Sequence, residues 1–316
     1  MNKLPIIIDT DPGIDDAMML TLAFSSEKLD VKLVTTCSGN ISQDKTNYNA
    51  RSLLTYLGVD VEIARGLEQP MFKKLVVAEE VHGETGFANV SFSEPTIPVS
   101  PRPAIKAMYE TIMESEEPIT IVATGPLTNV GALLLAHPEV KSNIKQISWM
   151  GGAAVGGNVT PTAEFNAYVD PHAADIVFRS GIPITMSGLD VTHKAYVTPQ
   201  EAERILNIGS DLGKKVHSML TYYLNNLKAS PFHEPHYAEV SRLHDLCAVM
   251  YLIHPEFFEG QNCFVEIELE GKITAGTTVV DYANQTGKQP NVNVLHTVDR
   301  EAFFEAFYQA IKKMSK

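Results

Sequence analysis

The stretch PIIIDTDPGIDDAMML, Pro5–Leu20, decides the fold of this 316-residue chain. Its apolar, β-branched opening predicts a strand at Leu4–Ile8, and its end predicts a helix over Asp15–Ser25. Four aspartates stand between or within these elements: Asp9, Asp11, Asp15 and Asp16. Open α/β sheets bind ligands beyond the carboxyl ends of their strands, so this charge lies where such a fold places a ligand.

Short apolar runs alternate with helical patterns beyond this stretch. The predicted strands are Val31–Thr36, Val61–Ala64, Ile119–Ala123, Gln146–Met150 and Ile184–Ser187. The predicted helices are Ser42–Leu57, Ala104–Glu116, Leu127–Ala136 and Pro171–Arg179. This alternation predicts an α/β fold, with a doubly wound, mostly parallel sheet and helices on both faces, as in Rossmann-like proteins.

The last third of the chain has a different pattern. Thr198–Glu201 reads TPQE, a capping box with proline at the first helical position, so a helix is predicted to begin there. Further helices are predicted at Leu212–Leu227, Leu243–Ile253 and Arg300–Lys313, and strands at Phe264–Leu269, Thr277–Val280 and Val292–His296. The sequence has no internal repeat or low-complexity linker, so we expect a single domain over residues 1–316. Irregular stretches at about 66–100 and 228–242 are predicted to be binding loops.

Composition excludes several classes of function. The net charge is −13, which disfavours a general nucleic-acid binder and a protein that coats anionic membranes. Three scattered cysteines do not indicate a disulfide framework. The sequence has neither a signal-peptide core nor an apolar stretch of about 18 residues, so we expect a cytoplasmic protein.

Crowded carboxylates repel one another, and a bound cation removes that cost. Asp15 or Asp16 alone could instead favour the helix N-terminus, but this does not account for four aspartates. Oxygen ligands indicate Ca²⁺ or Mg²⁺. An EF-hand loop counted from Asp9 fails, because Gly13 and Ile14 stand where the motif needs Asx and Gly.

A phosphatase of the haloacid dehalogenase type also places D-x-D after its first strand, and IIIDTD matches that pattern. Gly13 stands where that family has Thr or Val, and the pair Asp15 and Asp16 is left without a role. This alternative predicts a Mg²⁺-dependent phosphohydrolase with Asp9 as its nucleophile.

The segment DTDPGIDDAMML resembles the signature of the nucleoside hydrolases, the inosine–uridine-preferring family. Further segments follow in the family's order over nearly the whole chain: TTCSGN at 35–40, VHGETGF at 81–87, VATGPLTN at 122–129, WMGGAAVGGNVTPTAEFNAYVDPHAA at 149–174, LDVTH at 189–193 and LHDLCAV at 243–249. The glycines at 151–157 do not form a phosphate loop, because Asn158 stands where that motif needs Lys.

The resemblance implies Ca²⁺-dependent hydrolysis of the N-glycosidic bond of ribonucleosides, in nucleoside salvage and pyrimidine metabolism, and a homotetramer or homodimer. It implies a cation held by side chains and one backbone carbonyl: Asp11, Asp15, Asp16, Asp245 and Thr124 O. It implies ribose binding by Asp15, Asn40, Asn158, Glu164 and Asn166. Asparagines in such glycine-rich loops could instead serve turns, and Asp245 could instead serve a helix N-terminus.

The resemblance also assigns the reacting groups. Asp11 is implied to be the general base and Asp9 to support the loop. Histidine is the usual proton donor near neutral pH, and His244 matches the family's leaving-group acid, with His82 as a second active-site histidine. His193 is expected to support the site through hydrogen bonding.

His244 argues against the purine-specific group of the family, so we expect a pyrimidine-preferring or broad enzyme acting on uridine, cytidine or inosine. Trp149 is predicted to be a core residue. Base selectivity is expected from the long loops, with Tyr222, Tyr223, Asn226, His233, His236 and Tyr237 as candidates, although Tyr222 and Tyr223 fit helix packing equally well. A non-catalytic nucleoside-binding protein is the alternative outside the enzymes, and it would need neither Asp11 nor His244.

Overall fold

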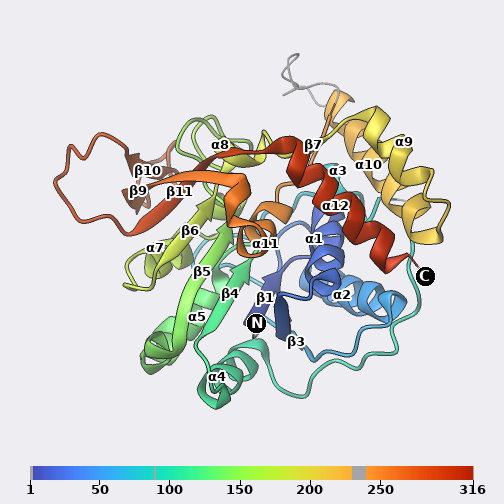
Figure 1. Cartoon of the computed structure of the whole chain (residues 1–316). Coiled ribbons are helices and arrows are strands. Elements are labelled where there is room, and N and C mark those ends of the chain that lie inside the picture. Colours follow the sequence, from blue (N-terminus) through green and yellow to red (C-terminus); the bar gives the residue numbers. More distant parts are fainter. Residues whose placement is uncertain (1–2, 89, 230–239, 316) are drawn as a thin grey trace.

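The computed structural model describes residues 3–88, 90–229 and 240–315, without the side chains of 226–229. Within these ranges, nine strands form one sheet in the order β10-β9-β11-β6-β5-β4-β1-β2-β3 (Figure 1). The strands are β1 (Leu4–Thr10), β2 (Leu29–Thr36), β3 (Ile63–Arg65), β4 (Ile119–Ala123), β5 (Ile144–Met150), β6 (Ile184–Ser187), β9 (Phe258–Ile267), β10 (Thr278–Asp281) and β11 (Val292–Val298). Strands β7 (Tyr196–Val197) and β8 (Ser241–Arg242) pair separately.

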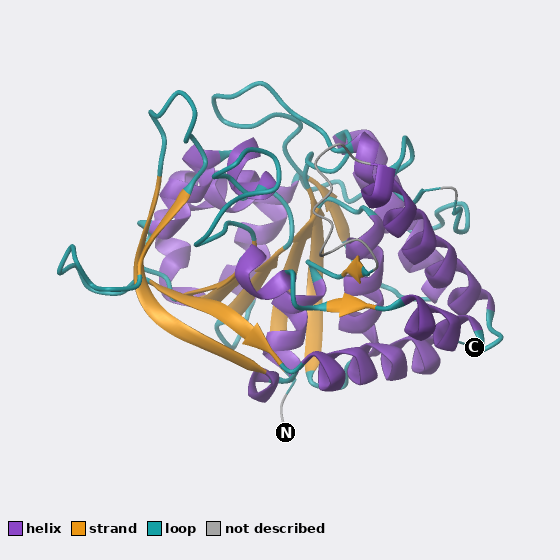
Figure 2. Cartoon of the chain, turned by 90° about the horizontal axis from the view of Figure 1, so that it is seen from above, coloured by secondary structure: helices purple, strands orange, loops and turns teal. Residues whose placement is uncertain are grey.

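Helices lie on both faces of the sheet, as the view from above shows (Figure 2). They are α1 (Ile14–Ser25), α2 (Gln43–Leu57), α3 (Glu79–His82), α4 (Ala104–Glu114), α5 (Thr128–Ala136), α6 (Phe165–Val169), α7 (Pro171–Phe178), α8 (Leu189–Thr192), α9 (Pro199–Leu206), α10 (Asp211–Ala229), α11 (Leu246–Ile253) and α12 (Arg300–Met314), with 3₁₀ helices η1 (Pro138–Asn143) and η3 (Pro255–Phe257). None of the described helices is long and apolar enough to cross a membrane.

Strand β1 lies inside the sheet, where it pairs in parallel with β2 on one side and β4 on the other. Ile6 and Ile8 belong to the hydrophobic core that includes α1, α11 and α12, whereas Ile7 belongs to the core that includes α4, α5 and α7. A parallel strand covered on both faces needs a continuous apolar run, which explains the isoleucines at 6–8.

The strand order reverses beside β1. The chain goes outward from β1 to β2 and β3, then returns to β4 and continues through β5 and β6 on the other side. Such a reversal leaves a crevice at the carboxyl ends of the two strands, here β1 and β4. The aspartate stretch therefore follows the strand at the switch point of the sheet.

The structure confirms the doubly wound, mostly parallel α/β fold. The capping box at α9 is also confirmed, since Thr198 Oγ1 accepts from Glu201 N at 3.2 Å and Glu201 Oε2 accepts from Thr198 N at 2.9 Å. That the chain is a single domain stays a prediction, which one sheet running from β3 to β10 favours.

Several predicted boundaries were wrong. Strand β9 begins at Phe258, six residues before the predicted strand, and it pairs antiparallel with both β10 and β11. Helix α11 begins at Leu246 rather than at Leu243. The irregular stretch at about 66–100 contains helix α3, and the sequence analysis did not foresee α6, α8 or the β7–β8 pair.

Candidate active site

Asp16 is the most highly bonded group of the aspartate stretch. Its carboxylate accepts from Thr10 Oγ1 at 2.5 Å, Thr124 Oγ1 at 3.0 Å, Gly13 N at 2.9 Å and Asn40 Nδ2 at 3.0 Å. The bond from Gly13 caps the first turn of α1, so the helix-cap role considered from sequence is one of several that Asp16 fills. These donors come from the end of β1 and the turn after it, from the loop after β2 and from the residue after β4, so Asp16 connects three strand ends.

Asp11 lies beside Asp16 and is completely buried. Its Oδ2 accepts from Asn40 N at 2.6 Å, whereas its Oδ1 has no hydrogen-bond partner among the described residues. The loop approaches closely because residue 39 is glycine: a Cβ there would lie 2.0 Å from Asp11 Oδ2. The free Oδ1 is an acceptor available to a ligand.

Three carboxylates converge at the carboxyl end of the sheet. Asp15, Asp16 and Asp245 each offer an oxygen, and these oxygens lie within 4.8 Å of one another. Asp245 stands at the N-cap position of α11 and accepts no capping hydrogen bond there, although its charge lies at the helix N-terminus, as the alternative role requires.

Burial dominates the electrostatics of this acidic cluster. Burial, with a further contribution from the Asp16 charge, raises the pKa of Asp15 to about 7 and that of Asp11 well above its usual range. Burial and the neighbouring Asp15 raise the pKa of Asp245 in the same direction. Buried carboxylates with an unpartnered oxygen fit the all-oxygen ligand set of a hard divalent cation, whose charge would remove the repulsion.

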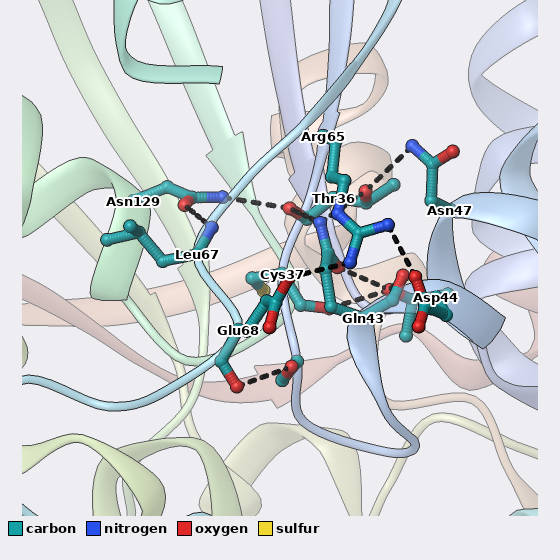
Figure 3. Close-up of polar contacts among 11 residues, drawn as sticks. Thr36, Cys37, Gln43, Asp44, Asn47, Arg65, Leu67, Glu68 and Asn129 are labelled. Atoms are coloured by element: carbon teal, nitrogen blue, oxygen red, sulfur yellow. Dashed lines mark hydrogen bonds and ion pairs between the residues drawn. The ribbon is translucent and has the colours of Figure 1, made fainter. Parts of the chain in front are cut away.

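Asp9 lies behind this cluster and supports it. Its Oδ1 accepts from Thr35 Oγ1 at 2.6 Å and from Asn129 Nδ2 at 2.8 Å, and its backbone O accepts from Thr124 N at 2.9 Å. Asn129 also donates to Thr36 O and accepts from Leu67 N, which attaches the long loop to the end of β2 (Figure 3). Burial raises the pKa of Asp9 to about 6.

Neighbouring polar contacts fix the loop that presents Asn40. Gln43 Nε2 donates to Thr36 O at 2.9 Å, and Ser38 Oγ donates to Glu68 O at 2.9 Å. Arg65 forms ion pairs with Asp44 and Glu68 at the outer side of the same loop (Figure 3). The contacts hold the ends of β2 and β3 together next to the acidic cluster.

The predicted histidines lie near this cluster. His82 ends α3, where its Nδ1 accepts from Ile14 N at 3.1 Å and its ring centroid lies 6.4 Å from that of Tyr223. His244 Nδ1 lies 2.8 Å from Thr192 Oγ1, and its ring centroid lies 5.9 Å from that of His193.

These histidines are held neutral by their surroundings. Burial lowers the pKa of His82 and of His193 to about 4. It lowers the pKa of His244 well below its usual range, and the neighbouring His193 adds to the effect. At neutral pH the site therefore offers uncharged imidazoles, each with a single N–H to donate.

The glycine-rich loop after β5 is held by three side chains acting on consecutive residues. Gly152 N donates to Glu164 Oε2 at 2.7 Å, and Ala154 N donates to Asp190 Oδ2 at 2.7 Å. Between them, Ala153 N donates to Thr278 Oγ1 at 2.8 Å and Ala153 O accepts from it at 2.6 Å. The loop is thereby fastened to α6, α8 and β10.

The residues predicted to bind ribose differ in placement. Asn166 is buried and its Nδ2 donates to Thr124 O at 2.9 Å, which joins it to the acidic cluster. Glu164 caps α6 through the amides of Asn166 and Ala167, and burial raises its pKa to about 7. Asn158 is exposed, and its Oδ1 accepts from Phe165 N at 2.9 Å, so it stabilises a turn in this structure.

Only some of the residues proposed to recognise the base lie in the described part of the chain. Tyr223 is buried beside His82, and the Tyr222 hydroxyl lies 3.0 Å from where a Cβ on Gly83 would be. His233, His236, Tyr237 and the side chain of Asn226 lie outside the described residues. Trp149 is a completely buried core residue, as predicted.

Sequence reasoning missed four hydroxyl groups that organise the site: Thr10, Thr124, Thr192 and Thr278. Thr10 and Thr124 directly end or follow a buried strand, which is a signal that a search for polar strand ends could have found. Thr192 and Thr278 act on partners far away in the chain, and no local pattern marks them.

Comparison with known proteins identifies the chain as a nucleoside hydrolase. The family described as inosine-uridine preferring nucleoside hydrolase matches residues 6–305, and this chain belongs to it. It is 44% identical over 311 residues, 98% of each chain, to the pyrimidine-specific ribonucleoside hydrolase RihA of Escherichia coli strain K12. The protein is therefore an enzyme, a ribonucleoside hydrolase, and the dehalogenase-like and non-catalytic alternatives are set aside.

Solved structures agree with this assignment. The purine-preferring ribonucleoside hydrolase from Gardnerella vaginalis superposes with a TM-score of 0.91 at 29% identity, covering 99% of both chains. The plant nucleoside hydrolase PpNRh1 superposes with a TM-score of 0.89 at 31% identity, covering 98% of this chain and 99% of the other.

Proposed function

We propose that this enzyme hydrolyses the N-glycosidic bond of pyrimidine ribonucleosides, with uridine and cytidine preferred and inosine accepted, and that it depends on Ca²⁺. The observation that carries the proposal is the buried acidic cluster with neutral histidines nearby. The preference for pyrimidines is supported by the 44% identity to relatives named pyrimidine-specific, against 29% to a purine-preferring structure.

The cation would be held by Asp11, Asp15, Asp16, Asp245 and the carbonyl of Thr124. The converging oxygens of the three-carboxylate cluster and the unpartnered Oδ1 of Asp11 support this ligand set. Thr124 O accepts one bond from Asn166, which leaves its second lone pair for a ligand. When bound, Ca²⁺ would supply positive charge that attracts the ribose hydroxyls and lowers the pKa of water.

Different side chains have different roles in the proposed reaction. Asp11 accepts the proton of the attacking water, and its Oδ1, which has no hydrogen-bond partner among the described residues, is an acceptor available for it. Asp15, Asn40, Asn158, Glu164 and Asn166 are the proposed ribose ligands. Carboxylate and amide dipoles fixed in advance stabilise the positive charge that develops on the sugar as the bond breaks.

The leaving base gathers negative charge and needs a hydrogen-bond donor. His244 fills that role in our proposal, and His82 is proposed as a second donor. Both are neutral, so each donates without placing a second positive charge against the ribosyl cation. Nucleoside salvage, a cytoplasmic location and a homotetramer or homodimer stay predictions from the sequence.

Release of reducing sugar tests the proposal. Purified enzyme is assayed on uridine, cytidine, inosine and adenosine with Ca²⁺, and again after chelation. We expect ribose release that is fastest on the pyrimidine nucleosides and is abolished by the chelator. Asp11→Asn should lower kcat by at least about 100-fold, whereas Asp60→Asn, at an exposed aspartate, should not change it. Ribose release that survives chelation, or an active Asp11→Asn enzyme, would contradict the proposal.

A further inference from the structure

The Thr192 side chain contacts His244, and the proposed reaction assigns no role to this contact. It is the last residue of α8, it is completely buried, and its Oγ1 lies 2.8 Å from His244 Nδ1. Its backbone N–H donates to Gly188 O at 3.0 Å, and its carbonyl accepts from Ala195 N at 3.1 Å. The backbone of Thr192 is thus satisfied, and its hydroxyl is directed at the imidazole.

The direction of this hydrogen bond follows from counting protons. A threonine hydroxyl has one hydrogen, which needs an acceptor when it is buried. Over the described part of the chain, His244 Nδ1 is the acceptor within hydrogen-bond distance of Thr192 Oγ1. If Nδ1 carried a proton, the hydroxyl would have to accept that bond, and its own hydrogen would be buried without a partner. The hydroxyl therefore donates and Nδ1 accepts.

A neutral imidazole carries a single proton, so an accepting Nδ1 places that proton on Nε2. We infer that Thr192 is a positioning residue whose hydroxyl holds His244 as the Nε2–H tautomer, with that N–H directed to the base that leaves. This inference rests on the proposed function, in which His244 serves the leaving base. The His193 ring packs edge-on against the same imidazole at 70°, which restricts its rotation.

The contact of His82 provides an internal reference for this assignment. Ile14 N donates to His82 Nδ1 at 3.1 Å, and a backbone amide can only donate. His82 therefore has no choice of tautomer and carries its proton on Nε2. The two histidines reach the same tautomer through different partners, a fixed amide and a rotatable hydroxyl, and only the second can be removed by substitution.

Nitrogen NMR tests the tautomer without any substrate. Enzyme labelled with ¹⁵N-histidine is measured with Ca²⁺ in the buffer, with His244 assigned by the signals lost in His244→Gln. We expect the His244 pattern to match that of His82, with an unprotonated Nδ1 and a protonated Nε2. A protonated Nδ1 on His244 in the wild-type enzyme would overturn the inference, whether or not the enzyme hydrolyses nucleosides.

Kinetics with two leaving groups tests the consequence. Thr192→Val removes the hydroxyl, and Thr192→Ser keeps it. Thr192→Val should lower kcat on uridine by about tenfold or more, a part of the roughly 10²–10³-fold that one hydrogen-bond donor to a developing anion supplies. It should change kcat on 4-nitrophenyl riboside by less than about threefold, because nitrophenolate is a stable anion that leaves without a hydrogen bond from Nε2–H. Thr192→Ser should restore uridine hydrolysis, and KM should not change.

The outcomes distinguish a failure of the role of Thr192 from a failure of the proposed function. Equal losses on both substrates, or an undiminished Thr192→Val enzyme, would overturn the role of Thr192. A wild-type enzyme that hydrolyses no nucleoside would count against the proposed function, and the NMR measurement would still decide the tautomer. The same measurement decides the question if Thr192→Val does not fold.

Discussion

Replacing Thr278 by valine separates the hydroxyl of this residue from its shape. Thr278 is buried on β10, and its Oγ1 exchanges two hydrogen bonds with the backbone of Ala153, at 2.8 and 2.6 Å. Valine fills nearly the same volume and offers no polar atom. The substitution therefore leaves the N–H and the C=O of Ala153 without their partner, in the loop that leads to Glu164.

The expected loss of stability follows from those two hydrogen bonds. A buried backbone group left unsatisfied costs about 1–3 kcal/mol. Because two groups are affected, we expect Thr278→Val to lower the free energy of unfolding by about 2–6 kcal/mol. Thr278→Ser keeps both bonds and loses one methyl group near Gly152, which costs about 1 kcal/mol.

Urea denaturation of the three proteins measures the difference, and initial rates on uridine measure its effect on the site. We expect KM to rise in Thr278→Val, because the loop that holds Gly152 against Glu164 is released. Thr278→Ser should stay close to wild type in both assays. If valine costs no more stability than serine, the two hydrogen bonds do not fasten the loop and our reasoning fails.

Three further predictions concern the acidic cluster. Asp16→Asn should weaken Ca²⁺ binding by about 10–100-fold in calorimetry, because a carboxylate that accepts four hydrogen bonds becomes an amide; unchanged affinity would remove Asp16 from the site. The pKa of Asp15 in the folded protein is raised to about 7. Protonated Asp15 therefore stabilises the calcium-free protein fully below about pH 4, and this stabilisation is lost as the pH rises through about 7. Protons compete with the cation over the same window, so the melting-temperature gain on adding Ca²⁺ should grow from about pH 6 to about pH 8, and a constant gain would contradict this. Gly39→Ala should lower kcat/KM by about 100-fold, since its Cβ would lie 2.0 Å from Asp11 Oδ2, and a loss below about threefold would show that the loop yields.

The interior of the fold could be predicted because its signal is local. Strands buried on both faces, such as β1 with Ile6, Ile7 and Ile8, need apolar residues at successive positions. The first half of β9 is different: Glu259–Asn262 are exposed and polar, and they form a strand only because β11 pairs with them. The two-residue strands β7 and β8 likewise depend on a partner distant in sequence.

The candidate site likewise has parts that the local sequence marks and parts that depend on residues distant in sequence. The aspartates at 9–16 could be recognised because all four lie within one short segment of the sequence. The role of Thr192 depends on a residue 52 positions away, and that of Thr278 on one 125 positions away, so both needed the structure. Asn158 was assigned to ribose from its matching position, and here it is exposed and serves a turn, so its contact with ribose stays a proposal.

The place of β1 in the sheet has a consequence for synthesis of the chain. Among the strands of the sheet, β1 is synthesised before the others, and its neighbour β2 is complete by residue 36. Its other neighbour, β4, is not complete until residue 123, and Asp245 follows more than a hundred residues later. Until β4 arrives, an apolar strand with one unpaired edge is open to association with other chains. Nascent or truncated chains that end before β4 should therefore aggregate, and a shortfall of chaperones should reduce the yield of enzyme.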